Sequence, residues 1–272
     1  MDKKSQYLIK MQPNNHVLVL GGSGGIGSEA VRALAANGAE IITIGYGGNQ
    51  TAAETLKAEV EAWGVKVFTA KIDRSSFASV ETAAEFVVSQ AGREITGVVD
   101  AIGISPNIPF KDLQLEDVDR VYNTNYRGCV ASTKILAERM KAKGIEGLFV
   151  IITSTNGDNS FSAQSLPYDD MKRGLDGLVA SLAERYAAFN IRLIGVAPGW
   201  VEDPDQSKGM NSTLPVGMIE RETSFIYLGR QAKAIEVGKF IAAMTMDSHS
   251  YVTGTTYKID GGYPRRNPIE QD

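Results

Sequence analysis

Residues 16–37 read HVLVLGGSGGIGSEAVRALAAN, in which an apolar run passes through a glycine-rich turn into a stretch of helical period. Glycines at 21, 25 and 27 would let the backbone turn tightly, approach a pyrophosphate and pack the helix close to the strand. The free N–H groups and positive dipole at the start of that helix favour an anion. This strand–turn–helix context predicts a dinucleotide-binding unit, with cofactor contacts from Gly21, Ser23, Gly25, Ile26 and Gly27.

Short apolar runs alternate with longer stretches of helical period from residue 15 onward. Most of the runs are continuous in apolar character, which is typical of strands that helices cover on both faces of a parallel sheet. The pattern predicts an α/β protein with a Rossmann-type, doubly wound parallel sheet of about seven strands and helices on both faces. The expected strands are 16–20, 40–46, 65–72, 97–104, 147–154, 191–197 and 255–259, and the expected helices are 25–37, 50–63, 76–91, 115–143, 166–189 and 235–246.

No linker composition divides the chain, so we expect a polar N-terminal tail over residues 1–14 and a single domain over 15–272. Residues 200–230 do not fit the alternation, because they mix turn-forming residues with apolar ones such as Met210 and Leu214. A stretch this long inside a compact domain is typical of a functional lid or of disorder. Since its apolar residues need something to cover, we predict a substrate lid.

The composition is that of a soluble globular protein, with 43% hydrophobic and 22% charged residues among 272. The formal net charge is −4 without a concentrated basic run, which argues against nucleic acid or an anionic membrane as a partner. Cys129 is the only cysteine and His16 and His249 are the only histidines, so we expect no disulfide within the chain and no metal site. The N-terminus lacks the apolar run of a signal peptide, and we expect a cytoplasmic protein.

The end of the second expected strand, in the text IITIGYGGNQT, bears on the choice of dinucleotide. An Asp or Glu at this point would accept hydrogen bonds from the ribose hydroxyls of NAD and repel the 2′-phosphate of NADP. Tyr46 stands here instead, and no carboxylate follows until Glu54. The sequence therefore favours NADP, with NAD possible, and Asn49 at the next helix start could hold the phosphate.

Two residues with acid–base chemistry lie four apart on an expected helix. Tyr168 and Lys172, in the text LPYDDMK, would share one helix face. A tyrosine with the ordinary pKa of about 10 is a weak catalyst at neutral pH, and a neighbouring ammonium would lower that pKa. Upstream, Ser154 ends an expected strand, at the edge where open α/β sheets place ligands.

The glycine-rich first turn, the strand-end Ser154 and the Tyr168-x-x-x-Lys172 pair together resemble the short-chain dehydrogenase/reductase family, and within it the 3-oxoacyl reductase-like branch. The resemblance spans residues 15–262, and its C-terminal part is the text SYVTGTTYKIDGGY. The further matches are Asp73 after the third strand, Asn125 in VYNTNYRGCV, and Pro198, Gly199 and Val201 in IRLIGVAPGWV.

The resemblance implies an enzyme that interconverts a carbonyl and a secondary alcohol by hydride transfer with NADP or NAD. Tyr168 would act as general acid/base, and Ser154 would polarise the same substrate oxygen. Lys172 would lower the pKa of Tyr168 and bind the nicotinamide ribose, while Asn125 would complete a proton path to solvent. The family also implies a homo-tetramer or homo-dimer, and cofactor contacts from Asp73, Ala101, Gly103, Tyr168, Lys172, Pro198, Gly199 and Val201.

The chain departs from the family at several positions. Family members usually read Asn-Asn-Ala-Gly after the fourth strand, whereas residues 100–103 read Asp-Ala-Ile-Gly. That text is closer to enoyl-thioester reductases of the same superfamily, but those enzymes usually space the tyrosine and lysine more widely. An enoyl reductase is therefore the alternative. Leu20 replaces a usual Thr, Ile194 a usual Asn, and Asp203 stands near a usual Thr that contacts the cofactor; we expect Asp203 to point to solvent.

The substrate pocket is expected to lie between Ser105, Asn107, Asn156 and the predicted lid. Apolar lid residues suggest a partly hydrophobic carbonyl compound, such as a 3-oxoacyl thioester, a ketone or a steroid-like molecule. A rival of another class is a catalytically silent NAD(P)-binding regulator. The chain keeps four residues that match the family's catalytic positions, which argues against this regulator because a sensor needs only the glycine turn. These residues are Asn125, Ser154, Tyr168 and Lys172.

Overall fold

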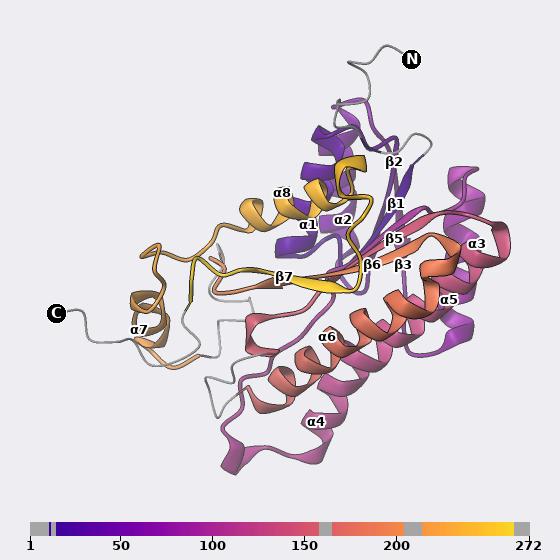
Figure 1. Cartoon of the computed structure of the whole chain (residues 1–272). Helices are drawn as coiled ribbons and strands as arrows, with labels where there is room; N and C mark the ends of the chain where they lie inside the picture. The colour runs from indigo at the N-terminus through magenta and orange to yellow at the C-terminus, as the bar shows by residue number, and fades with distance from the viewer. Residues whose placement is uncertain (1–10, 12–14, 158–164, 204–213, 264–272) are drawn as a thin grey trace.

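The computed structural model describes residues 11, 15–157, 165–203 and 214–263 of the chain. Within these residues, seven parallel strands form one sheet in the order β3-β2-β1-β4-β5-β6-β7, with helices on both faces (Figure 1). This is the predicted doubly wound α/β fold. The strands are β1 His16–Leu20, β2 Ile41–Tyr46, β3 Lys66–Lys71, β4 Gly97–Asp100, β5 Gly147–Ile152, β6 Ile191–Pro198 and β7 Thr255–Ile259.

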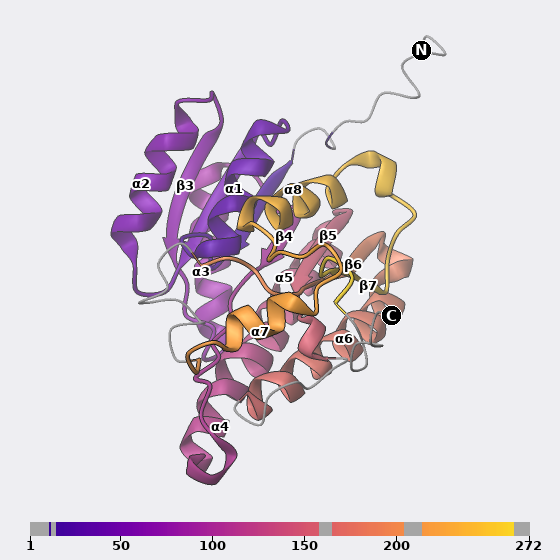
Figure 2. The same ribbon diagram turned by 90° about the vertical axis from the view of Figure 1, so that its left-hand side faces the viewer.

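The helices divide between the two faces of the sheet, as Figure 2 shows from the side. Alternate residues of β1 point in opposite directions: Val17 and Val19 join one apolar cluster, while Leu18 and Leu20 join the other. The first cluster packs under α1, α2 and α8, and the second under α3, α5 and α6. Helices cover both faces of the sheet, which explains why the strand sequences are continuously apolar. The helices are α1 Gly25–Ala36, α2 Gln50–Glu61, α3 Phe77–Ala91, α4 Leu115–Val121, α5 Gly128–Lys143, α6 Leu166–Tyr186, α7 Met218–Ser224 and α8 Ala234–Met244.

Most bounds agree with the sequence-based expectation to within three residues, and two elements differ more. The strand expected over 97–104 ends at Asp100. Ala101 N still donates to the Leu20 carbonyl, but beyond it side chains bind the backbone: Asp100 accepts from Ile102 N, and Asn125 bonds Ile104. The helix expected over 115–143 is helical throughout, but it passes through a π-helical segment at Tyr122–Arg127 between α4 and α5. Such segments are frequently found at functional sites.

The order of the strands fixes where a ligand can bind. The chain moves outward from β1 to β3 and then returns to β4 on the other side of β1. The carboxyl ends of β1 and β4 therefore flank the point at which the winding reverses, and open α/β sheets bind ligands in the crevice there. The glycine turn after β1 and the segment after β4 both lie at this point.

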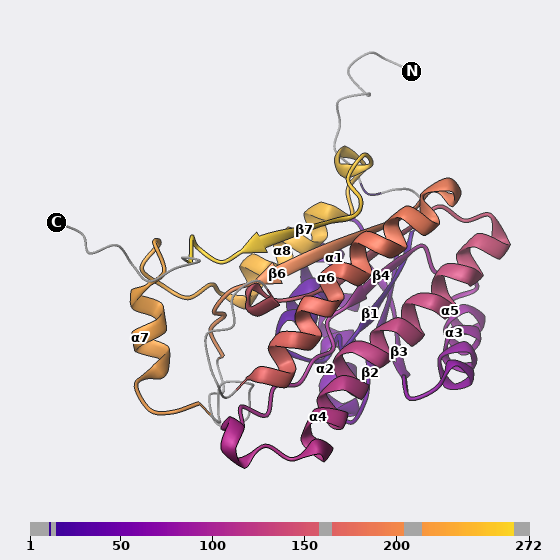
Figure 3. The same ribbon diagram turned by 60° about the horizontal axis from the view of Figure 1, so that its bottom comes forward.

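The interval predicted to form a lid contains α7, which stands away from the sheet in Figure 3. Residues 204–213 of that interval, including Met210, lie outside the described residues. Of the predicted N-terminal tail, the structure describes Met11, which packs on the first cluster and forms a bridge with Met246. In the described part of the chain, no helix is long and apolar enough to cross a membrane.

A buried histidine ties β1 to its neighbours and makes stability depend on pH. His16 is fully buried, with its ring bonded to the Thr43 hydroxyl at 2.9 Å and the Arg93 carbonyl at 3.0 Å. Burial lowers the pKa of His16 below its ordinary 6.5. The unfolded chain therefore takes up a proton below pH 6.5 that the folded chain resists.

We expect the free energy of unfolding to fall as the pH drops below 6.5, until the lowered pKa of His16 is reached. This one proton contributes at most about 1.4 kcal/mol per pH unit. Urea unfolding of the wild type and of His16→Gln at several pH values measures the effect. The variant should show a shallower dependence on pH, and an identical slope in both proteins would contradict the assignment.

Candidate active site

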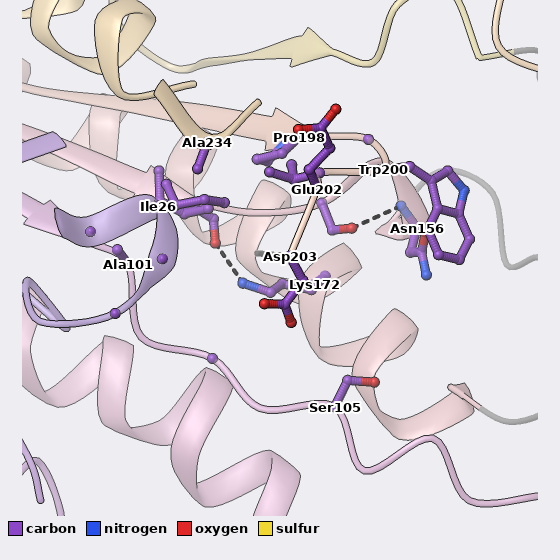
Figure 4. A pocket seen from close by; sticks show the side chains of 18 of the residues that line it. Ile26, Ala101, Ser105, Asn156, Lys172, Pro198, Trp200, Glu202, Asp203 and Ala234 are labelled. Atoms are coloured by element: carbon purple, nitrogen blue, oxygen red, sulfur yellow. Dashed lines mark hydrogen bonds between the residues drawn. The ribbon is translucent and has the colours of Figure 1, made fainter. Parts of the chain in front are cut away.

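A cavity of about 640 Å³ opens at the carboxyl edge of the sheet. It is enclosed by the start of α1, the segment after β4, the end of β5, the first turns of α6 and the loop after β6 (Figure 4). Ser154, Tyr168 and Lys172 all line it. The structure also brings into its wall the predicted cofactor residues Gly25, Ile26, Gly27, Ala101, Gly103, Pro198, Gly199 and Val201.

The glycine turn has the shape that a dinucleotide requires. Gly21 has a φ of 72°, and a Cβ on Gly27 would collide with the Gly21 carbonyl oxygen. A Cβ on Gly25 would meet no described atom within 4 Å, so the backbone there is open to the cavity. Helix α1 has no acidic residue in its first turn and no side-chain cap, which leaves its N–H groups to an anion. These residues fit a pyrophosphate.

The end of β4 explains the position of Lys172. Asp100 is the last residue of β4 and pairs with Ile151 of β5, so the next residue, Ile152, lies beyond that ladder. The Lys172 ammonium, 3% exposed, donates to the Ile152 carbonyl at 2.6 Å. It lies 5.6 Å from the centre of the Tyr168 ring. A Cβ on Gly103 would come within 3.4 Å of Lys172 Nζ, so glycine leaves room for the ammonium.

Burial shifts both titratable groups of the pair. It raises the pKa of Tyr168 to about 12; a hydrogen bond with Ser154 opposes this shift and the Asp169 charge adds to it. It lowers the pKa of Lys172 to about 8, against the attraction of Asp100. Burial therefore outweighs the other effects on Tyr168 in this structure, and the expectation that Lys172 lowers the pKa of Tyr168 stays a prediction.

Asn125 holds the segment after β4 in place. Its amide oxygen accepts from Ile104 N at 2.8 Å, and its amide nitrogen donates to the Ile104 carbonyl at 2.9 Å. Asn125 is fully buried on the π-helical segment. Its side chain thus positions the wall of the cavity, and the predicted role in a proton path stays a prediction.

Residues predicted to meet the adenosine half lie outside the cavity lining, at the ends of β2 and β3. The Gly22 N–H donates to the Gly45 carbonyl at 3.0 Å, which places Tyr46 beside the glycine turn. The Asn49 side chain caps α2 through Ala52 N. Both carboxylate oxygens of Asp73 accept from Ser75, whose N–H lowers the pKa of Asp73. Gly21 and Ser23 also lie outside the lining.

Sequence reasoning missed Lys71. It is the register partner of Tyr46, so the two side chains share one face of the sheet. Lys71 is exposed. The pairing of β2 with β3 therefore adds a positive charge at the position where the sequence showed none.

Asp203 lines the cavity and is partly buried, which corrects the expectation that it points to solvent (Figure 4). Ala232 N donates to the Trp200 carbonyl, and Glu202 N donates to the Ala232 carbonyl. This bridge between Val201 and Ala232 fixes the loop after β6. Asp203 follows this bridge in the chain, and its side chain lines the cavity.

A buried ion pair supports the end of β4. The Arg74 guanidinium contacts the Asp100 carboxylate at 2.5 Å, with both side chains about 5–6% exposed, and donates to the Thr124 carbonyl at 2.7 Å. Ser132 also donates to Asp100. The pair joins β4, the loop after β3 and the π-helical segment. Nothing in the sequence pattern signalled it, because its two partners meet only through the sheet topology.

The fold and this cavity define an α/β oxidoreductase with a dinucleotide site at the carboxyl edge of its sheet. A short-chain dehydrogenase family model, described as enoyl-(acyl carrier protein) reductase, matches residues 21–264. The chain belongs to the short-chain dehydrogenase/reductase family. It is accordingly an NAD(P)-dependent enzyme that acts on CH–OH and C=O groups.

Curated relatives match over almost their whole length. Oxidoreductase UcpA of Salmonella typhimurium is 32% identical over 249 residues, which cover 90% of this chain and 92% of the relative. The 3-oxoacyl-[acyl-carrier-protein] reductase FabG of Thermotoga maritima is 31% identical over 245 residues, covering 90% and 96%. The NADP-dependent mannitol dehydrogenase of Hypocrea jecorina is 30% identical over 254 residues, covering 92% of each.

Solved structures agree on the fold. A short-chain dehydrogenase/reductase from Serratia marcescens aligns with a TM-score of 0.81 and 27% identity, covering 93% of this chain and 99% of that one. A gluconate 5-dehydrogenase from Burkholderia cenocepacia, in complex with NADP and tartrate, aligns with a TM-score of 0.82 and 23% identity, covering 93% and 96%.

We expect Asp100→Asn to lower the free energy of unfolding by about 3 kcal/mol, because the Arg74 charge stays buried without its partner. The double variant Arg74→Met/Asp100→Asn should recover most of that loss. Urea unfolding measures both. The control is Asp170→Asn, which breaks a half-exposed pair with Arg173 and should cost less than about 1 kcal/mol. A double variant that is no more stable than Asp100→Asn would contradict this assignment.

Proposed function

We propose that the protein is an NADP(H)-preferring reductase that interconverts a carbonyl and a secondary alcohol, with Tyr168 as general acid/base. The observation that carries this proposal is the convergence of Ser154, Tyr168 and Lys172 on one cavity with the glycine turn. A 3-oxoacyl thioester or another ketone is the proposed substrate class, in line with the 3-oxoacyl reductase relative.

The bound dinucleotide would supply the hydride that forms the new C–H bond. Tyr168 gives its phenolic proton to the carbonyl oxygen as the C=O π bond breaks, which completes the alcohol. Burial raises the pKa of Tyr168 to about 12, which supports the protonated form that reduction needs. Ser154 accepts from the backbone N–H of Asn156 at 3.2 Å, and its O–H, which bonds Tyr168 in this structure, would donate to the substrate oxygen once substrate is bound.

Lys172 places a positive charge near the Tyr168 ring. Its ammonium is held on the Ile152 carbonyl, inside the cavity that also holds Tyr168. A cation there stabilises the phenolate left after proton transfer. With the pKa of Lys172 lowered to about 8, the positive form is still the main one at neutral pH.

The preference for NADP rests on the ends of β2 and β3. Tyr46 replaces the carboxylate that would repel a 2′-phosphate, and the exposed Lys71 lies beside it. Helix α2 has no acidic residue in its first turn, so its N-terminus favours the phosphate. The relative named as an NADP-dependent mannitol dehydrogenase supports the same preference.

Several expectations stay predictions. Leu214 and Met218 line the cavity, which supports the proposed lid over residues 200–230. An enoyl-thioester reductase is the second candidate, favoured by the description of the matching family model. The four-residue spacing of Tyr168 and Lys172 argues for the carbonyl reductase. Assembly as a homo-tetramer or homo-dimer also stays a prediction.

We expect Tyr168→Phe to lower turnover of a ketone panel at least about 100-fold, because the proton donor is lost. Binding of NADPH, measured by its fluorescence, should stay within about threefold of the wild type. Oxidation of NADPH, followed by absorbance, measures turnover. Undiminished turnover would reject the mechanism, and a wild type that binds NADPH but reduces no ketone of the panel would favour the non-catalytic NAD(P)-binding rival.

We expect wild-type protein to bind NADPH more tightly than NADH, and Lys71→Gln to weaken NADPH binding about three- to tenfold with little change for NADH. Fluorescence titration with each nucleotide measures the four affinities. Lys66→Gln is the matched control, because Lys66 starts the same strand at the far end from the glycine turn. Tighter binding of NADH by the wild type would overturn the proposed preference.

A further inference from the structure

A buried carboxylate next to Tyr168 has no part in the chemistry proposed above. Asp169 is fully buried in the first turn of α6. It accepts a hydrogen bond from the Ser165 hydroxyl at 3.0 Å and another from the Asn156 side-chain amide at 2.9 Å. The helix N-terminus and these two donors stabilise its negative charge. A buried charge of this kind requires an explanation, because its desolvation is costly.

The carboxylate fixes the orientation of the Asn156 amide. An ionised carboxylate only accepts, so the NH₂ group of Asn156 must face Asp169 and the amide oxygen must face away. Within the described residues, no donor bonds that oxygen. Asn156 is partly buried and lines the cavity, as Figure 4 shows. Asp169 therefore presents a hydrogen-bond acceptor at the wall of the substrate cavity.

The residue that carries this acceptor is bonded to Ser154. The backbone N–H of Asn156 donates to Ser154 Oγ at 3.2 Å, and Ser154 is the residue proposed to bind the carbonyl oxygen. A substituent on the carbon next to that carbonyl would come within reach of Asn156. A hydroxyl there would satisfy the amide oxygen, whereas an alkyl group would leave that oxygen without a hydrogen-bond donor.

We propose that Asn156, positioned by Asp169, determines specificity by accepting a hydrogen bond from a hydroxyl group adjacent to the reacting carbonyl. The substrate class is then an α-hydroxy ketone, or a vicinal diol in the reverse direction. This inference rests on the proposed function and narrows the broader expectation of a ketone. Two further polar residues of the cavity agree with it, since Ser105 donates to Asn107 at 2.8 Å and both line the wall.

The test uses two ketones of nearly the same shape, hydroxyacetone and 2-butanone, in which a hydroxyl replaces a methyl group. With NADPH, we expect wild-type kcat/KM to be at least about tenfold higher for hydroxyacetone. Asp169→Asn should reduce this ratio to about threefold or less, because an amide at 169 lets Asn156 turn either way. Asp170→Asn is the matched control on the neighbouring, exposed carboxylate, and it should keep the wild-type ratio.

Asn156→Leu is the second variant, and it keeps the test valid if Asp169→Asn fails to fold. It should lose most of its activity on hydroxyacetone and a smaller part on 2-butanone. Equal wild-type kcat/KM for the two ketones, or a preserved ratio in either variant, would overturn the inference and leave the proposed function intact. If neither ketone is reduced although NADPH binds, the inference fails, and the wider panel used for Tyr168→Phe then decides the proposed function.

Discussion

The carbonyl of Ile152 lies one residue beyond the last pair that β4 makes with β5. The Lys172 ammonium, rather than a β4 residue, donates a hydrogen bond to it. The early end of β4 opens the crevice, and the Arg74–Asp100 ion pair holds that end in position. Asn125 then bonds the segment that leaves the sheet. These three contacts hold the end of β4 and the segment after it, and they place the Lys172 ammonium in the cavity.

The buried charges at and behind this cavity are costly to desolvate. The charge of Lys172 is disfavoured by burial, as its lowered pKa shows, and the negative charge of Asp100 opposes that effect. Asp100 is itself paired with Arg74, so the charges of Arg74, Asp100 and Lys172 influence one another in the interior. Removing one would leave the others uncompensated, which costs more than the pair contributes. We interpret these buried charges as serving the proton transfer proposed for Tyr168.

The sequence predicted the fold well because its strands are buried on both faces. The bounds of β1 and β7 are those expected, since apolar runs and turn signals coincide there. The residues Ser154, Tyr168 and Lys172 could be selected from motif and spacing. Distant pairings could not: Arg74 with Asp100 and Tyr46 with Lys71 meet only through strand order. The raised pKa of Tyr168 and the inward direction of Asp203 depend on burial and loop path, which one-dimensional spacing does not contain.

Cys129 lies on α5 in the second apolar cluster, 1% exposed, and burial together with the nearby Asp100 charge raises the pKa of its thiol. As the only cysteine in the chain, it gives the molecule one natural labelling position. A thiol reagent can react there only after an opening of the structure exposes the buried thiol. The rate of labelling therefore reports the opening of the layer that carries Asn125, without any engineered probe.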